Sequence, residues 1–291
     1  MISKMEDSLK VIGIGELLWD LLPSGKQLGG APCNFVYHAQ KLGADGLVLS
    51  SVGDDEYGKE ILELLNIKNI SSELIQITNR PTGTVDVLLN KEGIPQYTIH
   101  EDVAWDFIQF NERVLKEVTE ADIICFGSLA QRNKVSQLTI EQALNNCGPQ
   151  SLIVFDINLR QEYYSLEVIE NSLQLCNVLK LNEEELPEVS RLLGLSAGNE
   201  ENQIQQLIEK YHLKLVAFTK GEAGSLLVTP DEVSFLSTPR VDVKDTVGAG
   251  DSFTAAMMIG FARGERLEQL HKSAVELSAF VCARDGAMPE Y

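Results

Sequence analysis

The sequence predicts an α/β fold with a mostly parallel sheet that helices cover on both faces. Short runs rich in Val and Ile alternate with segments whose apolar residues recur at helical spacing, and this alternation is typical of βαβ units. Residues 82–105 break the rhythm. They alternate apolar and polar residues around a turn at Asn90–Gly93, which predicts an inserted, half-buried β-hairpin.

The elements can be assigned in order along the chain. Residues 11–14 read as the first strand, and 34–42 as a helix because Phe35, Val36 and Ala39 repeat at helical spacing. Residues 17–30 contain PSG and GG but no helical pattern. Further strands are expected at 47–52, 123–126, 152–156, 178–181, 215–219 and 241–243, and further helices at 58–66 and 252–261.

Composition narrows the class of protein. The chain has 43 acidic and 24 basic residues, a net charge of −19, so we expect no nucleic-acid partner. It lacks an apolar run of about 18 residues, so we expect no membrane span. The N-terminal stretch does not read as a signal peptide. Five scattered cysteines without a C-x-x-C pair indicate free thiols in the cytoplasm. Without a linker or repeat, we expect one domain over 1–291, with an inserted lid at about 17–30 and 82–105.

A glycine-rich stretch, Lys244 to Met258, reads KDTVGAGDSFTAAMM. Its glycines would lie at a helix start, where main-chain N–H groups and the helix dipole attract anions. Asp251 there suits phosphoryl transfer to a hydroxyl, since a carboxylate can accept the hydroxyl proton while the N–H groups hold the phosphoryl group. The alternative is a helix N-cap, which the G-x-G-D pattern alone favours.

Other phosphate and nucleotide motifs are missing. The chain has neither a Walker A motif nor the H-R-D and D-F-G motifs of protein kinases. GIGELL follows a strand but has Leu18 where a dinucleotide fingerprint needs its third glycine. A dinucleotide-dependent oxidoreductase is therefore disfavoured.

Several stretches occur in the order found in one family. DTVGAGDSF resembles the C-terminal signature of the ribokinase-like sugar kinases, also called the phosphofructokinase-B type. GELLWDLLPSGKQLGGAPCNFVYHAQKLGA is similar to the N-terminal signature, and SVGDDEYG, FDINLR, LKLNEEEL and TKGEAGSLL lie between them. The segments GTVDV, YTIHEDVAWD and FGSLAQR are most similar to fructokinase-type members. The resemblance covers about Val11 to Pro289.

This resemblance implies a Rossmann-like core with a small β-sheet lid, ATP as phosphate donor and a sugar hydroxyl as acceptor. Matching positions imply Asp251 as the catalytic base. They also imply that the main chain of Gly248, Ala249 and Gly250, together with that of Asp251, forms the anion hole. The sugar-binding positions of the family correspond to Asp20, Gly29, Gly30 and Asn34; the alternative is that Asp20 is a loop residue and Asn34 an N-cap.

The same comparison implies cofactor positions. Arg160 corresponds to an arginine near the phosphates or the substrate; an ordinary surface arginine is the alternative. Asn182 and Glu185 correspond to an N-x-x-E motif that organises Mg²⁺ and its waters; a negatively charged first helical turn is the alternative. The nucleotide-binding turn corresponds to Thr219, Gly221 and Gly224, with a plain glycine-rich hairpin as the alternative. A monovalent cation such as K⁺, used by some relatives, would contact Asp245, Val247 and Gly286.

The sequence thus predicts a cytoplasmic, ATP-dependent carbohydrate kinase, with fructose as the first acceptor to consider. The alternatives are a kinase of the same family for another sugar, a sugar acid or a nucleoside, and a catalytically silent sugar-binding sensor. A lid sheet with free strand edges also predicts a homodimer through the lid.

Overall fold

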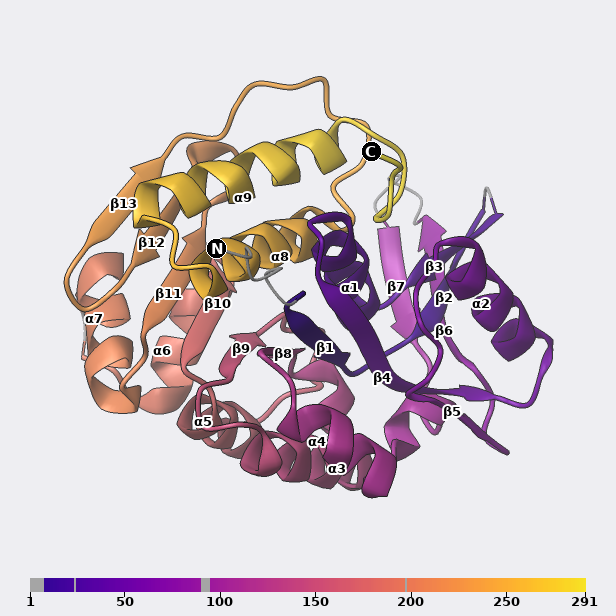
Figure 1. Cartoon of the computed structure of the whole chain (residues 1–291). Coiled ribbons are helices and arrows are strands. Elements are labelled where there is room, and N and C mark those ends of the chain that lie inside the picture. Colours follow the sequence, from indigo (N-terminus) through magenta and orange to yellow (C-terminus); the bar gives the residue numbers. More distant parts are fainter. Residues whose placement is uncertain (1–7, 24, 90–94, 197) are drawn as a thin grey trace, which may run out of the picture.

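A nine-stranded sheet forms the centre of the computed structural model, which describes residues 8–23, 25–89, 95–196 and 198–291 (Figure 1). The strand order is β13-β12-β11-β10-β9-β8-β1-β4-β5. The strands from β11 to β5 are parallel, and β12 and β13 extend the sheet in antiparallel fashion. The strands are β1 (Lys10–Ile14), β4 (Asp45–Gly53), β5 (Ile75–Thr78), β8 (Ile123–Phe126), β9 (Leu152–Asp156), β10 (Val178–Asn182), β11 (Leu215–Thr219), β12 (Ser225–Val228) and β13 (Val233–Leu236).

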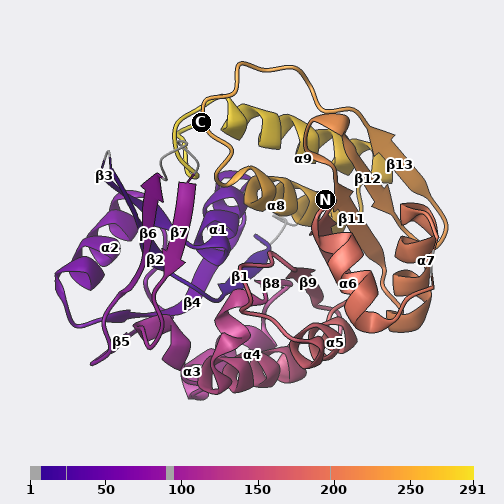
Figure 2. The same ribbon diagram turned by 180° about the vertical axis from the view of Figure 1, so that it is seen from behind.

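Helices cover both faces of this sheet, as the sequence predicts (Figures 1 and 2). One face packs against α1 (Ala31–Lys41), α8 (Ala249–Ala262) and α9 (Leu267–Cys282), with α2 (Glu56–Ile67) beside them. The other face packs against α3 (Glu112–Thr119), α4 (Lys134–Asn146), α5 (Leu166–Leu175), α6 (Glu185–Leu193) and α7 (Glu200–Tyr211).

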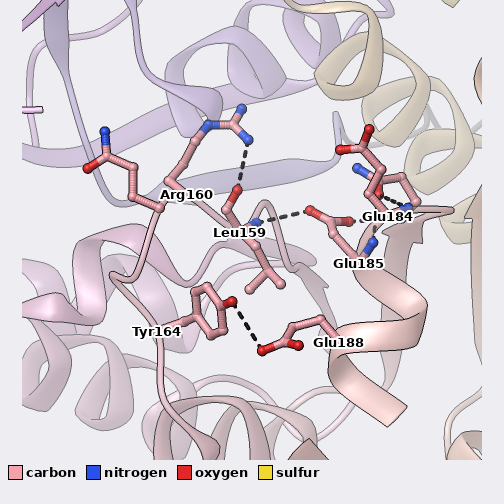
Figure 3. Close-up of a pocket in the computed structure, with 8 residues that line it drawn as sticks. Leu159, Arg160, Tyr164, Glu184, Glu185 and Glu188 are labelled. Atoms are coloured by element: carbon pink, nitrogen blue, oxygen red, sulfur yellow. Dashed lines mark hydrogen bonds between the residues drawn. The ribbon is translucent and has the colours of Figure 1, made fainter. Parts of the chain in front are cut away.

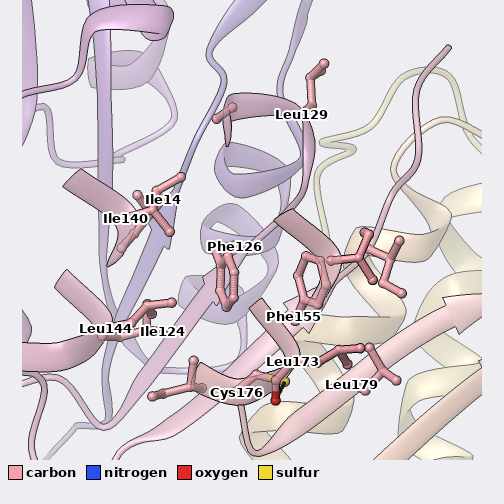
Figure 4. Packing of buried hydrophobic residues seen from close by; sticks show 14 of the residues in the cluster. Ile14, Ile124, Phe126, Leu129, Ile140, Leu144, Phe155, Leu173, Cys176 and Leu179 are labelled. Carbon is pink, nitrogen blue, oxygen red and sulfur yellow. Dashed lines mark hydrogen bonds between the residues drawn. The ribbon is translucent and has the colours of Figure 1, made fainter. Parts of the chain in front are cut away.

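Burial on both faces explains the continuous apolar character of the central strands. Successive side chains of β8 point to opposite faces, so Ile123 joins one core cluster and Ile124 the other. In the cluster that contains Ile124, the rings of Phe126 and Phe155 stack with centroids 5.0 Å apart (Figure 4). A parallel sheet with helices on both sides therefore places two hydrophobic cores in this chain.

A separate four-stranded sheet contains the two segments expected to form the lid. Its order is β3 (Gly25–Gly29), β2 (Leu18–Leu22), β6 (Gly83–Leu89) and β7 (Pro95–Ile99). The β2–β3 and β6–β7 pairs are antiparallel, and β2 and β6 pair in parallel. The lid lies beside α2 (Figure 1), and Trp19 Nε1 donates to the Tyr57 carbonyl at 3.1 Å. The two segments, which are far apart in the sequence, thus form one sheet through the pairing of β2 with β6.

The structure departs from the sequence prediction at one expected strand. The strand expected at 241–243 is wrong: β13 is followed by an irregular segment that leads to α8. The side chains of residues 241–243 are exposed, and in the described part of the chain these residues pair with no strand of either sheet. The turn expected at Asn90–Gly93 lies outside the described residues. Within the described part of the chain, no helix is both long and apolar enough to cross a bilayer.

The aromatic pair between β8 and β9 provides a test of the packing. Phe155→Ala is expected to reduce the free energy of unfolding by about 3–5 kcal/mol, because the ring is fully buried and its removal leaves a cavity. Phe235→Ala, at a side chain that is 55% exposed on β13, is the matched control and should cost less than about 0.5 kcal/mol. Urea unfolding of both variants measures the difference, and similar losses would contradict this packing.

Candidate active site

The candidate site lies where parallel strands end and helices begin. The carboxyl ends of β1, β9, β10 and β11 meet at one edge of the sheet, and α1 and α8 start above them. Ligands of open α/β sheets bind at this edge because the loops there, rather than the packed strands, are free to contact them. The residues singled out in the sequence fall on these loops and helix starts.

Asp251 and Asn34 meet across this edge. Asp251 lies in the first turn of α8, and its Oδ2 accepts a hydrogen bond from Asn34 Nδ2 at 2.8 Å. Gly248, not Asp251, occupies the N-cap position of α8, which has no side-chain cap. Gly30 is the N-cap of α1, so Asn34 is no cap either. Both capping alternatives are therefore excluded.

The first turn of α8 presents free main-chain N–H groups. The Ala249 N–H donates to the Thr246 carbonyl at 3.3 Å, but the described residues provide no main-chain acceptor for the N–H groups of Gly250 and Asp251. Gly248 has φ = 78°, and a Cβ there would lie 2.6 Å from that of Ala287. Only glycine fits this turn, which leaves the helix end open to an anion.

The residues expected to hold a sugar are also neighbours. A Cβ on Gly29 would lie 2.5 Å from Asp20 Oδ2, so the carboxylate rests directly on the Gly29 main chain. Asn34 is buried, and its Oδ1 has no hydrogen-bond partner among the described residues. An unpaired buried oxygen is costly, which indicates that a ligand hydroxyl completes the set.

The acidic groups of the site hold protons more tightly than usual. Burial raises the pKa of Asp251 to about 6, and Asp156 adds to the rise. Burial also raises the pKa of Asp20 to about 6 and that of Glu16 to about 7. The charge of Arg160, an exposed residue, opposes the rise in the pKa of all three carboxyls.

A cavity of about 310 Å³ adjoins Arg160, between the loop after β9 and the start of α6. Figure 3 shows Glu185 pointing toward the main-chain nitrogen of Leu159, while the Arg160 guanidinium lies on the other side of Leu159 and donates to its carbonyl at 3.1 Å. Glu185 accepts from the Leu159 N–H at 2.9 Å and from the Asn182 N–H at 2.8 Å. The N-x-x-E motif thus ties β10 to the loop that carries Arg160.

The oxygens of this motif fit Mg²⁺ only through water. Each Glu185 oxygen already accepts a main-chain N–H, and Asn182 Oδ1 accepts from Glu184 and Glu185. The second lone pairs of the Glu185 oxygens can still accept water, whereas both lone pairs of Asn182 Oδ1 are already used. Mg²⁺ usually retains several waters. Among the described residues, no three His, Cys, Asp or Glu side chains are grouped to bind a metal directly.

The expected nucleotide positions lie together in one turn, and the expected cation positions are grouped around Asp245. Thr219 ends β11, and Gly221 and Gly224 form the turn into β12, both with positive φ. This turn is a hairpin, so the hairpin alternative holds for its shape without deciding its role. Asp245 accepts from the N–H groups of Val247, at 3.0 Å, and Gly286, at 3.1 Å, which joins the segment before α8 to the segment after α9 and brings the three expected cation contacts together.

Three buried charged residues of the site were given no role by the sequence. Glu16 follows β1 and accepts from the Ala31 N–H at 3.1 Å. Asp156, the last residue of β9, is 4% exposed and binds Lys180 and Thr254. A lysine inside the apolar run VLKL was the signal that could have revealed this pair.

The family description of pfkB carbohydrate kinases matches residues 24–290. The chain belongs to this family. An uncharacterized sugar kinase of Pyrococcus horikoshii, PH1459, is 31% identical over an alignment of 297 positions that covers 95% of this chain and 91% of that protein. Its crystal structure has a TM-score of 0.81 and covers 96% of this chain and 93% of its own.

Fructokinases are also similar. The Escherichia coli fructokinase is 29% identical over an alignment of 268 positions that covers 88% of this chain and 85% of that one. The Xylella fastidiosa fructokinase structure has a TM-score of 0.84 at 20% identity and covers 96% of this chain and 94% of its own; at that identity it supports the fold alone. This pfkB kinase therefore has the ribokinase-like architecture that its sequence motifs predict.

The raised pKa of Asp251 has a consequence for stability. A carboxyl whose pKa rises from 3.8 to about 6 on folding stabilises the protein at low pH and ceases to do so as pH rises through 6. Asp251→Asn removes the buried charge, so its effect on the free energy of unfolding should be about 1–2 kcal/mol more favourable at pH 8 than at pH 5. Asp231→Asn, on an exposed loop, is the control. Urea titrations at both pH values that show equal effects would contradict the assignment.

Proposed function

We propose that this pfkB kinase transfers the γ-phosphoryl group of ATP to a hydroxyl of a neutral sugar, with fructose as the first candidate. The observation that carries the proposal is the Asp251 carboxylate. It is held by Asn34 at 2.8 Å and lies in the same helical turn as two free N–H groups. A proton acceptor and an anion site within one helical turn suit phosphoryl transfer to an alcohol.

The reaction follows from this arrangement. Asp251 accepts the hydroxyl proton as the sugar oxygen attacks the γ-phosphorus, and the bond from phosphorus to the β,γ-bridging oxygen breaks to release ADP. The N–H groups of Gly250 and Asp251, and the main chain of Gly248 and Ala249 around them, face the negative charge that builds up on the transferring group. Arg160 supplies a fixed positive charge beside it.

The charges around the acceptor favour an uncharged substrate. Asp20, Glu16 and Asp251 surround the proposed sugar position, and Arg160 is the cation whose field reaches all three. Lys26, a lid lysine, is already paired with Glu60; Lys91, the other, lies outside the described residues. A phosphorylated sugar or a sugar acid would add a negative charge to an acidic site, whereas hydroxyls can donate to these carboxylates.

The cofactor side of the site is consistent with ATP and Mg²⁺. The crystal structure of PH1459 with ATP has a TM-score of 0.80 and 28% identity to this chain, and we assign the turn at Thr219, Gly221 and Gly224 to the nucleotide. Mg²⁺, when bound, neutralises phosphate charge. Asn182 and Glu185 would order its waters, and Asp245, Val247 and Gly286 would contact K⁺.

The base assignment predicts a large kinetic defect. Asp251→Asn is expected to lower kcat about 10²–10⁴-fold, because the amide keeps the hydrogen bond to Asn34 but cannot accept the hydroxyl proton. Asp231→Asn is the control, with unchanged kcat. Coupled detection of ADP measures both, and near-normal turnover by Asp251→Asn would refute the base assignment.

The sugar-site assignment predicts a different pattern. Asp20→Ala and Asn34→Ala should each raise the sugar KM by about tenfold or more, since each removes a hydrogen-bond partner of a sugar hydroxyl, while the KM for ATP changes little. Asn34→Ala also releases Asp251 and should lower kcat. If neither variant changes the kinetic constants for the sugar, Asp20 and Asn34 do not bind it.

The acceptor itself is identified by an ADP-release assay over neutral sugars, sugar acids, phosphorylated sugars and nucleosides, with and without K⁺. Turnover confined to a neutral sugar is expected. Preference for an acidic or phosphorylated acceptor would overturn the charge argument, and binding of sugar and ATP without ADP formation would indicate a silent sensor instead.

A further inference from the structure

A buried lysine lies directly beneath the proposed anion site. Lys180 is the third residue of β10, its side chain is 9% exposed, and its Nζ donates to Asp156 Oδ1 at 3.0 Å. A buried ion pair costs desolvation energy that its own attraction rarely exceeds. A lysine in the middle of an apolar parallel strand therefore calls for a reason other than stability.

The pair is connected to the first turn of α8 at two points. A Cβ on Gly250 would lie 3.1 Å from Lys180 Nζ, so the ammonium group packs against the main chain of Gly250. Thr254 donates to Asp156 Oδ2 and also contacts the Gly250 carbonyl, both at 2.9 Å. The lysine thus sits one residue from Asp251 and on the inner side of the turn whose N–H groups are free.

The protonation state of the lysine is secure. Burial by itself lowers the pKa of Lys180, but the Asp156 and Glu185 carboxylates outweigh burial, and the pKa lies above its ordinary value. The ammonium group has three N–H donors, and Asp156 is its hydrogen-bond acceptor in the described structure. Lys180 is consequently a permanent positive charge behind the anion site.

Several charged or titratable groups face Asp251 from the elements packed around it. Burial and the Asp156 charge raise its pKa, while Asn34 on α1, Lys180 on β10 and Arg160 after β9 lower it. The other groups whose titration is coupled to Asp251 are Glu16 after β1, Cys33 on α1 and Cys125 on β8. Burial raises the thiol pKa to about 12 for Cys33 and well above the usual value for Cys125, so both stay neutral.

We propose that Lys180 is a positioning residue of the phosphoryl-transfer site: it packs under Gly250, holds the first turn of α8 and places a positive charge behind that turn, next to Asp251. Asp156 orients the lysine and moderates that charge. This inference rests on the proposed role of Asp251 as the base, and it explains why a charged pair occupies the interior of the sheet. Lys180 acts through Asp251 and the turn and does not need to touch the sugar.

The two members of the pair should shift the pH profile in opposite directions. In the acid range, kcat/KM for the sugar reports protonation of Asp251 in the free enzyme. Lys180→Met removes the positive charge and should move the acid limb up by about one pH unit, whereas Asp156→Asn removes the negative charge and should move it down by a similar amount. The double variant K180M/D156N removes both charges and should return the limb close to that of the wild type.

A merely structural ion pair gives a different result. Breaking such a pair from either side would lower kcat or stability without moving the limb, or would move it in the same direction for both single variants, and either outcome would overturn the proposal. If Lys180→Met does not fold, as judged by circular dichroism and thermal unfolding, Asp156→Asn and the double variant still test it: the downward shift and its reversal are both required.

The experiment also separates this inference from the proposed function. If Asp251→Asn remains active and the wild-type profile has no acid limb near pH 6, the base assignment fails whatever Lys180 does. If Asp251→Asn is inactive and the limb is present but does not respond to the charge of the pair, only the role of Lys180 fails.

Discussion

The site depends on one hydrogen bond between residues 217 positions apart, from Asn34 Nδ2 to Asp251 Oδ2. Asn34 lies in the first half of α1 and Asp251 in the first turn of α8, and these helices pack side by side on one face of the sheet. The bond fixes the direction of the carboxylate, and with it the distance between the proton acceptor and the free N–H groups. Everything proposed for the chemistry uses this arrangement.

The surroundings of that bond are electrostatically balanced. Burial and nearby carboxylates raise the pKa of Asp251, and Asn34, Lys180 and Arg160 oppose the rise. The balance leaves the pKa near 6, low enough for the group to be ionised at neutral pH and high enough for it to accept a proton readily. The site thus concentrates buried charge where a packed core would avoid it, which is typical of functional sites.

The lid is joined to the same edge of the sheet through its strands. Gln161 donates to the Tyr97 carbonyl at 2.8 Å, and Tyr163 donates to Glu101 at 2.8 Å, so the loop that carries Arg160 is bonded to β7 and the residues after it. Another strand of the same small sheet, β2, carries Asp20. A change in the position of the lid would therefore act on both the proposed sugar contact and the proposed phosphate contact.

The sequence by itself determined the class of fold and the segments of the small second sheet, and it supplied most of the candidate site residues, because these follow from local periodicity and from ordered motifs. The same reasoning failed at residues 241–243, where a short valine-rich run has no neighbouring strand, and pairing is not visible in local sequence. Only the tertiary structure decided that Asp251 meets Asn34 rather than capping its helix, and that Lys180 and Asp156 form a buried pair beneath Gly250. Burial and distance between remote segments set those contacts, and they arise only when the strands and helices pack together.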